Sequence, residues 1–351
     1  MRFIESGDWG LIPIGIGTNV LYGKNRCELF ADGGESDLVL REKVRKSFIE
    51  CVVVLALGLG LASCSSDTTA VTGLHNLTFA LKLSRDTASL YAGRTVQLTA
   101  VLKDGDGNVV SGVPIVWTSS SNDVATVSND GLVTATKLGS ATISATAQQV
   151  SATATITVLH DPIIFVHGFE SSGAIWGTMI DRLKADGWTD APLVTWTYDT
   201  HISNATIAQQ LQAKTDSLLT VTGATKIDII AHSMGGLSSR YFSKNLGGSD
   251  KIDALVFLGT PNHGASLANF CGIQSCLEMR PGSAFLTALN SGDETPGTAR
   301  YATWWSPCDQ AVTPVESPAL QGATNTQTAC IAHTDLYTDA TVYAQVRAWI
   351  R

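Results

Sequence analysis

One serine lies in a context that favours nucleophilic chemistry. Ser233 belongs to the hexapeptide 231–236, which follows the apolar, β-branched run 226–230 and precedes a segment with helical spacing. A sharp turn between a strand and a helix needs small residues two positions to either side, here Ala231 and Gly235, and it holds the serine Oγ out at the top of the sheet. A hydroxyl held in this way is available to a histidine base. The pattern therefore predicts that Ser233 is a nucleophile.

Acyl transfer also needs a base, and the expected chain order is nucleophile, acid, histidine. Beyond Ser233 the chain contains only His263 and His333. His263 precedes nearly every candidate acid, so we prefer His333 as the base. We expect His232 and His263 to be hydrogen-bonded structural histidines, with the His232 side chain pointing away from the site.

The acid should follow a strand that lies between the serine and the histidine. Asp309 meets this condition because it comes after the strand-like run 299–305. The alternative for Asp309 is a solvated loop residue. The other carboxylates lie at the wrong end of a strand or in a loop flanked by Gly and Pro: Asp250, Asp253, Asp293 and Glu294.

Two N–H groups must stabilise the oxyanion. One belongs to the residue after the nucleophile, here Met234, and the other to the loop after the first core strand. The apolar run 162–166 is such a strand, and it ends in His167-Gly168. We therefore expect the Phe169 N–H to be the second donor.

Strands alternate with helical segments from residue 160 to 351, which predicts a mostly parallel sheet with helices on both faces. Three short motifs, 166–168, 231–236 and 258–261, resemble the α/β-hydrolase superfamily, and specifically small bacterial lipases with an Ala-x-Ser-x-Gly elbow. The resemblance implies a triad of Ser233, Asp309 and His333, with Phe169 and Met234 as oxyanion donors and no cofactor or metal. Residues 265–298 are longer than in the smallest members, which suggests a short cap or lid-like loop.

Residues 77–158 show about seven short alternating strands separated by turn signals such as Asp104–Gly107. We expect 96–101 to be one strand, 113–117 to be another, and Trp117 to fill the centre of an all-β sandwich. The segment resembles the group 2 bacterial Ig-like domains. Such modules serve as spacers, stalks or adhesion units, and we favour a spacer.

The N-terminal part has the organisation of an export signal. Residues 41–63 combine a basic start with an apolar core, and the sequence Leu61-Ala62-Ser63-Cys64 resembles the lipobox of bacterial lipoproteins. The resemblance implies that Cys64 is acylated, which would make the protein an exported lipoprotein anchored at the outer membrane or cell surface. A plain signal peptide is the alternative. Residues 64–76 would form a tether, and we interpret 1–40 as an extension from a mis-assigned start.

Four cysteines remain in the exported part, and an even number in an oxidising compartment predicts two disulfides. Proximity favours Cys271 with Cys276 and Cys308 with Cys330 among the three possible connectivities. The second bridge would bring two α-carbons to about 5.5 Å and hold the Asp309 and His333 loops together. A zinc site is the competing interpretation, and it is weak because only His333 lies within a few residues of any of these cysteines.

Length and charge limit the remaining possibilities. The 351 residues suggest two domains with appendages, and a formal net charge of −8 without a basic stripe beyond the N-terminal cluster argues against nucleic-acid binding. We expect a monomeric serine carboxylester hydrolase that acts on lipid esters through an acyl-enzyme. The alternatives are a short-chain esterase, an aliphatic polyester depolymerase, or a surface adhesion protein with a degenerate hydrolase segment.

Overall fold

The computed structural model describes residues 9–13, 18–23, 26–31 and 78–350. The predicted signal segment, the tether and Cys64 lie outside these residues, so the lipidation of Cys64 stays a prediction. The three N-terminal ranges form an antiparallel sheet of order β1-β2-β3, within the segment interpreted as an extension. No helix in the described part of the chain is long and apolar enough to cross a membrane. The bounds of this sheet are β1 (Trp9–Pro13), β2 (Thr18–Gly23) and β3 (Arg26–Ala31).

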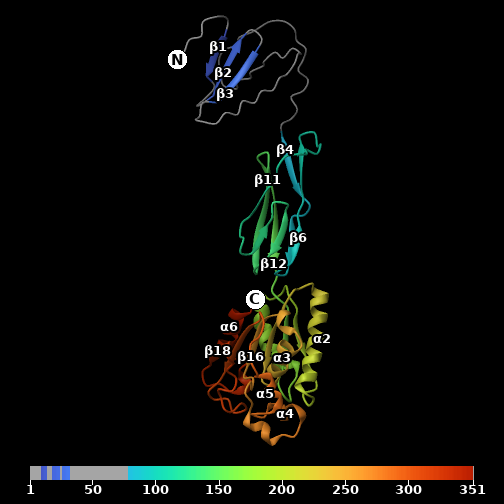
Figure 1. Cartoon of the computed structure of the whole chain (residues 1–351), viewed down its shortest axis with the longest axis vertical. Coiled ribbons are helices and arrows are strands. Elements are labelled where there is room, and N and C mark those ends of the chain that lie inside the picture. The colour runs from blue at the N-terminus through green and yellow to red at the C-terminus, as the bar shows by residue number, and fades with distance from the viewer. Residues whose placement is uncertain (1–8, 14–17, 24–25, 32–77, 351) are drawn as a thin grey trace. The chain divides into compact units, whose positions relative to one another are not determined.

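Residues 79–158 fold into short strands whose inner faces share one apolar core (Figure 1). Leu98, Ile143 and Ile156 are fully buried there. The sheets have the orders β6-β10-β9, β5-β12-β11-β8 and β4-β7, so the predicted all-β segment is confirmed. Its strands are β4 (Phe79–Leu83), β5 (Thr87–Leu90), β6 (Thr95–Gln97), β7 (Ala100–Asp104), β8 (Val116–Ser119), β9 (Ala125–Val127), β10 (Leu132–Ala135), β11 (Gly139–Ala147) and β12 (Val150–Val158).

Three local predictions in this segment were wrong. The run 96–101 is split between β6 and β7, which belong to different sheets, because the chain changes sheet at Leu98, whose N–H donates to the Gly131 carbonyl at 2.9 Å. The strand expected at 113–117 begins only at Val116. Trp117 is half-buried and packs against the core without filling its centre.

The segment from residue 160 onward is built on a six-stranded parallel sheet of order β14-β13-β15-β16-β17-β18. The predicted α/β-hydrolase sheet is therefore confirmed. The edge strand β18 was not expected, because its sequence TNTQ is polar and carries no apolar run. The strands are β13 (Ile163–Val166), β14 (Leu193–Trp196), β15 (Ile227–His232), β16 (Ile252–Leu258), β17 (Arg300–Trp305) and β18 (Thr324–Gln327).

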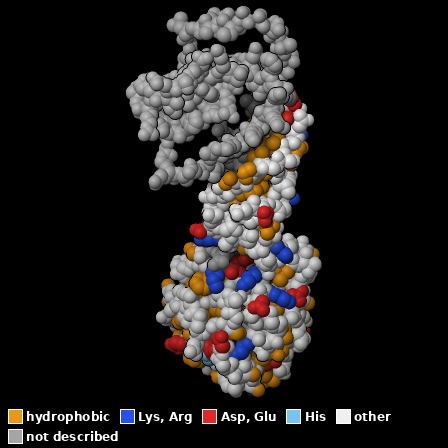
Figure 2. Space-filling view, turned by 45° about the horizontal axis from the view of Figure 1, so that its top comes forward, with side chains coloured by type: hydrophobic (Ala, Val, Ile, Leu, Met, Phe, Trp, Pro, Cys, Tyr) orange, Lys and Arg blue, Asp and Glu red, His pale blue; other side chains and the backbone are white. Residues whose placement is uncertain are grey.

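Helices cover both faces of this sheet, with α2 and α6 on opposite sides of β16 (Figure 1). Alternate side chains of each strand enter one of two cores, so Ile229 packs with α2 and α3 while Ile230 packs with α1 and α6. On the face in Figure 2, acidic and basic side chains are interspersed. The bounds are η1 (Gly173–Trp176), α1 (Gly177–Ala185), α2 (Asn204–Thr222), α3 (Met234–Asn245), η2 (Gly248–Asp250), η4 (His333–Asp335) and α6 (Ala340–Trp349).

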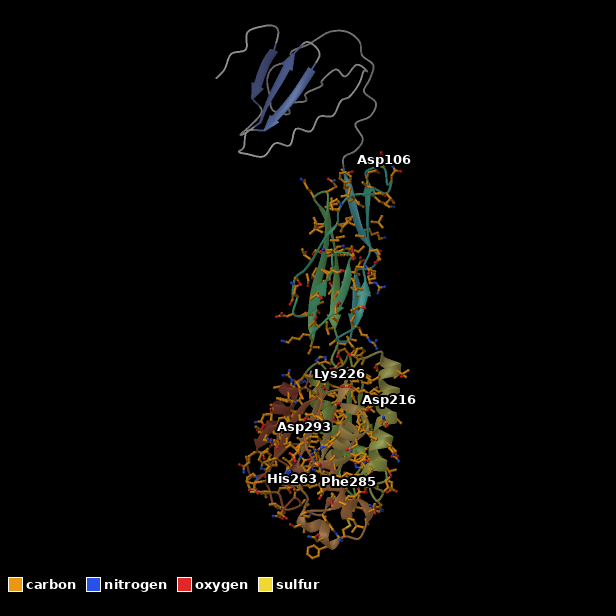
Figure 3. The ribbon with its side chains drawn as sticks, viewed as in Figure 1. Asp106, Asp216, Lys226, His263, Phe285 and Asp293 are labelled. Carbon is orange, nitrogen blue, oxygen red and sulfur yellow. A yellow bond between two sulfur atoms is a disulfide. The ribbon has the colours of Figure 1, made fainter. Side chains whose placement is uncertain are left out.

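The two ends of the parallel sheet differ in what they carry. Lys226 immediately precedes β15 and His263 follows β16, and Figure 3 shows them at opposite ends of the sheet. The insertion expected at 265–298 lies after β16, at the carboxyl end, where it forms η3 (Ser266–Phe270), α4 (Gln274–Met279) and α5 (Ala284–Leu289). We call residues 265–281 the cap.

Candidate active site

Ser233 occupies the turn between β15 and α3, as the sequence predicts. Its φ of 53° lies in the left-handed region, which costs a non-glycine residue energy that the surrounding structure must offset. The turn tolerates no larger neighbour, because a Cβ at Gly235 would lie 2.3 Å from the His167 carbonyl oxygen. The Ser233 N–H donates to the Leu258 carbonyl at 2.9 Å, which ties the turn to the end of β16.

The predicted acid and base meet at the carboxyl end of the same sheet. His333 Nδ1 lies 2.6 Å from Asp309 Oδ2, and the Asp309 carboxylate also accepts the N–H groups of Ala311 and Val312 at 2.8 and 2.9 Å. Burial raises the pKa of Asp309, but the hydrogen bond and charge of His333 and the two backbone donors outweigh burial and hold the pKa below its ordinary value. Asp309 is therefore an ionised carboxylate at neutral pH, and it fixes the proton of His333 on Nδ1.

The base and the nucleophile converge on the loop after β16. A Cβ at Gly259 would lie 3.0 Å from His333 Cε1 and Nδ1, so the ring lies directly over that glycine. The preceding residue, Leu258, accepts the Ser233 N–H. Among the described residues the Ser233 Oγ makes no side-chain hydrogen bond; contacts of this kind are often long before substrate binds.

The loop after β13 is held by a buried histidine. The His167 ring stacks on Tyr198 with centroids 4.1 Å apart, its Nε2 accepts the Tyr198 N–H at 3.4 Å, and its Nδ1 therefore donates to the Gly168 carbonyl at 2.8 Å. Burial lowers the pKa of His167, which keeps it neutral. This arrangement fixes the backbone immediately before Phe169.

The two predicted oxyanion donors flank the nucleophile. A Cβ at Gly168 would lie 2.8 Å from the Ser233 Cβ, so the loop that carries Phe169 touches the elbow. Within residues 78–350 the Phe169 N–H has no hydrogen-bond acceptor. Met234 opens α3, and its N–H is one of the four at a helix start that lack an intrahelical acceptor.

The four cysteines form the two disulfides that proximity favours, which removes the zinc interpretation. Cys271 joins Cys276 with α-carbons 5.8 Å apart, and Cys308 joins Cys330 with α-carbons 5.0 Å apart. The second bridge connects the Asp309 loop to the His333 loop, as the sequence suggests.

A polar pair beside Phe169 was not found from the sequence. His201 Nε2 hydrogen-bonds to Glu170 Oε1, and the His201 ring lies 6.0 Å from the Phe169 ring between centroids. Glu170 has a φ of 49°, so a non-glycine residue in the left-handed region directly follows the predicted donor. Both residues are exposed. They lie 31 positions apart in the sequence, and no spacing rule connects them.

The cap is fastened to the start of α2. The Glu278 carboxylate accepts Ser203 Oγ at 2.7 Å and both the N–H and the side-chain amide of Asn204, at 2.7 and 2.9 Å. A carboxylate at a helix N-terminus interacts favourably with the helix dipole. Ser275 Oγ also donates to the Thr200 carbonyl at 2.6 Å. The cap thus joins the loop after β16 to the loop after β14 across the carboxyl end of the sheet.

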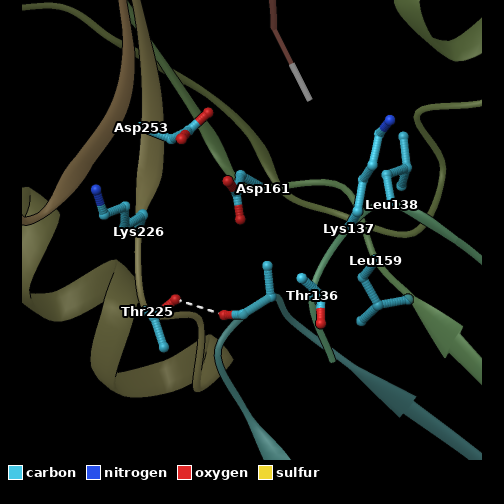
Figure 4. Close-up of a pocket in the computed structure, with 9 residues that line it drawn as sticks. Thr136, Lys137, Leu138, Leu159, Asp161, Thr225, Lys226 and Asp253 are labelled. Atoms are coloured by element: carbon cyan, nitrogen blue, oxygen red, sulfur yellow. Dashed lines mark hydrogen bonds between the residues drawn. The ribbon is translucent and has the colours of Figure 1, made fainter. Parts of the chain in front are cut away.

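The opposite end of the sheet carries a separate acidic cluster. Ligand atoms of Asp161, Asp228 and Asp253 lie within 4.8 Å of one another, and Asp253 accepts a hydrogen bond from Arg300 at 2.5 Å. Asp161 and Asp253 line a small hollow that Figure 4 shows. These residues precede β13 or belong to the first half of β15 and β16, so they are remote from Ser233. The other residues lining the hollow are Ala92, Thr136, Lys137, Leu138, Leu159, Thr225 and Lys226.

The chain is similar to several known lipases. Two triacylglycerol lipases, from Pseudarthrobacter phenanthrenivorans and Burkholderia plantarii, are each 37% identical over 73 residues, which is 21% of this chain and 22% and 19% of those proteins. The chain therefore spans about a fifth of these curated relatives. Among solved structures, the mature Bacillus licheniformis lipase BlEst2 is similar with a TM-score of 0.48 and 18% identity, covering 55% of this chain and 93% of that one. Aspergillus fumigatus lipase B has a TM-score of 0.47 and 14% identity, with coverage of 53% and 51%.

Family profiles divide the chain at the point where its architecture changes. The profile described as bacterial Ig-like domain (group 2) matches residues 80–158. The profile described as lipase (class 2) matches residues 160–346, more than half of the chain and the whole of the parallel sheet. The chain belongs to the class 2 lipase family.

Proposed function

We propose that this protein is a serine carboxylester hydrolase that acts through an acyl-enzyme. The observation that carries the proposal is the partly buried Asp309–His333 hydrogen bond, 2.6 Å long, beside a serine on a strained turn. Because Nδ1 carries the proton that faces Asp309, the Nε2 lone pair of His333 is available to accept the Ser233 proton.

The reaction then follows from the positions of these groups. His333 takes the proton as Ser233 Oγ bonds to the ester carbonyl carbon, and the oxyanion accepts the N–H groups of Phe169 and Met234. Collapse of the tetrahedral intermediate breaks the carbon–oxygen bond to the alcohol, which leaves with the proton from His333. Water then attacks the acyl-enzyme by the same route and releases the acid.

The cap supports a lipid ester as substrate. Four large apolar side chains are exposed in residues 160–350, and three of them belong to the cap: Leu267, Phe270 and Leu277. Phe270 is 88% exposed. The only carboxylate of the cap, Glu278, is buried against α2, and Arg280 donates to three carbonyls of the cap itself. The exposed residues of the cap therefore include three large apolar side chains and no acidic one, which suits contact with an ester-rich surface.

Ser233→Ala tests the chemistry. We expect this change to reduce turnover of p-nitrophenyl esters by on the order of 10⁴-fold or more and to abolish labelling by a fluorophosphonate, with unchanged thermal unfolding. Ser291→Ala, at an exposed loop serine, is the matched control and should keep both signals. Retained turnover by the Ser233 variant would place the nucleophile elsewhere.

The acyl chain length tests the substrate class. We expect turnover by the unaltered protein to continue with medium- and long-chain esters presented as an emulsion. A rate confined to acetyl and butyryl esters would favour a short-chain esterase, and release of soluble acids from an aliphatic polyester film would favour a depolymerase. Absence of any turnover together with absence of fluorophosphonate labelling would leave the adhesion alternative.

A further inference from the structure

His232 is the side chain that connects the nucleophile turn to the base. It is the last residue of β15 and directly precedes Ser233, and it is buried. Its Nε2 lies 3.1 Å from the carbonyl oxygen of His333. Its ring lies 4.6 Å from the His333 ring and 4.8 Å from the Tyr337 ring, edge-on to the latter. The sequence predicted a hydrogen-bonded structural histidine here, and its partner is the backbone of the predicted base. The prediction that the His232 side chain points away from the site was wrong, because its ring lies against that of His333.

The protonation state of His232 follows from its surroundings. A carbonyl oxygen only accepts hydrogen bonds, so Nε2 must carry the proton in this contact. Burial, followed by the neighbouring His333, lowers the pKa of His232 to about 3, which leaves Nδ1 without a proton at neutral pH. That nitrogen is buried, has no hydrogen-bond partner among the described residues, and would lie 3.2 Å from a Cβ at Gly168. His232 therefore fills the space between the base and the oxyanion loop as a neutral ring with one donor.

This bond matters because the nucleophile and the base are otherwise joined only indirectly. His333 opens the short helix η4 in a loop that the Cys308–Cys330 bridge ties to the Asp309 loop. The disulfide does not connect the His333 loop to the turn that holds Ser233. The His232 hydrogen bond connects His333 to that turn, because His232 and Ser233 are neighbours in the chain. A shift of about 1 Å between reacting groups can reduce a rate 100-fold.

We propose that His232 is a positioning residue that sets the distance between His333 and Ser233 by donating its Nε2–H to the His333 carbonyl. In this role His232 acts through the backbone of His333 and transfers no proton itself. The inference rests on the proposed function, because it presumes that His333 is the base for Ser233.

Two variants at this position separate the hydrogen bond from the filling of space. His232→Met replaces the ring with an unbranched side chain of similar length that has no hydrogen-bond donor. His232→Gln places an amide N–H the same number of bonds from Cα as the histidine Nε2. We expect His232→Met to lower kcat on a soluble p-nitrophenyl ester 10- to 100-fold with KM within about twofold, and to slow fluorophosphonate labelling equally. We expect His232→Gln to recover kcat to within about fivefold of the unaltered protein.

A matched control is available at His263, whose Nδ1 lies 3.0 Å from the Ser317 carbonyl but which has no contact with the triad. His263→Met should leave kcat unchanged. Equal losses of kcat in His232→Met and His232→Gln, or full activity in His232→Met, would overturn the proposal. If the unaltered protein itself neither turns over esters nor reacts with the fluorophosphonate, the proposed function is wrong. That result is distinct from a failure of the His232 proposal, which requires an active unaltered protein.

A measurement without turnover tests the same bond. In ¹⁵N NMR spectra of the Ser233→Ala protein, we expect one histidine to stay neutral with its proton on Nε2 from about pH 8 down to about pH 4, and its signal to vanish in His232→Gln. Assignment of the Nδ1–H form to His232, or its titration near the ordinary histidine pKa, would overturn the proposal even if either variant failed to fold.

Discussion

The two disulfides stabilise loops with different tasks at the same end of the sheet. Cys308–Cys330 spans 22 positions and joins the loop of Asp309, whose side chain is buried, to the loop of His333, whose side chain is half-buried. Cys271–Cys276 spans five positions within the cap, whose Phe270 side chain is almost fully exposed. One disulfide thus joins the loops of the predicted acid and base, and the other lies in a segment that exposes large apolar side chains.

The surroundings of the two bridges explain why their loss should differ. Around Cys308–Cys330, the buried Ser306 Oγ accepts the N–H groups of Cys308 and Ile331, each at 3.0 Å, so polar contacts reinforce the bridge. The cap is held from outside its bridge by Glu278 and Ser275, which bind the start of α2 and the Thr200 carbonyl. The first bridge therefore acts on the reacting groups, while the second acts on a unit that is already fastened elsewhere.

The largest expected difference comes from removing each bridge in turn. We expect Cys308→Ser with Cys330→Ser to lower kcat on a soluble ester at least 10-fold and to lower the free energy of unfolding by about 3 kcal/mol through the entropy of the unfolded chain. Cys271→Ser with Cys276→Ser should lower the free energy of unfolding by about 2 kcal/mol with kcat unchanged. Steady-state kinetics and denaturant titration check both variants. Equal effects on kcat would erase the distinction between the regions.

The sequence predicted the parts of this site that depend on local runs of residues. The apolar strands, the elbow at Ser233 and both cysteine pairs are encoded within short windows, and the structure has them where they were expected. The Asp309–His333 contact could be predicted because the sequence also indicated a disulfide between their two loops. The roles of these residues in catalysis stay predictions.

The features that sequence reasoning missed depend on tertiary contacts. The His232 bond joins residues 101 positions apart, and the Glu170–His201 pair joins residues 31 positions apart. Neither has a pattern of its own in the chain. The strand β18 was missed because an edge strand can be polar, and the run 96–101 was misjudged because its alternation continues while the chain changes sheet at Leu98.

A smaller effect should distinguish the cap from the site by the physical state of the substrate. We expect Phe270→Asp to reduce hydrolysis of an emulsified long-chain ester about 10-fold, because a carboxylate is costly to place against an apolar phase. Turnover of a soluble ester should be unchanged. Val221→Asp is the matched control, since Val221 is 75% exposed near the end of α2, at the far end of the sheet. Equal losses on both substrates would mean that Phe270 acts on the site itself.

The smallest expected effect concerns the exposed pair beside Phe169. The hydrogen bond with Glu170, followed by the charges of Glu170 and Asp199, raises the pKa of His201 above its ordinary value. The charged pair is therefore fully present below the ordinary histidine pKa and is lost as pH rises through the raised value. Glu170 directly follows Phe169, and its own backbone is in the left-handed region. Loss of the Glu170–His201 pair should therefore loosen the loop that carries the Phe169 N–H, the predicted oxyanion donor.

We accordingly expect the ratio of kcat/KM between the unaltered protein and His201→Gln to fall two- to threefold between about pH 5 and about pH 9. Taking the ratio cancels the titration of the base, which both proteins share. His160→Gln removes a similar histidine–carboxylate contact, with Asp190 at 2.7 Å, before β13 at the far end of the sheet, and its ratio should stay flat. A flat ratio for His201→Gln as well would show that the loop before Glu170 is held by His167 and the elbow alone, which would confine the positioning of the oxyanion donors to buried residues.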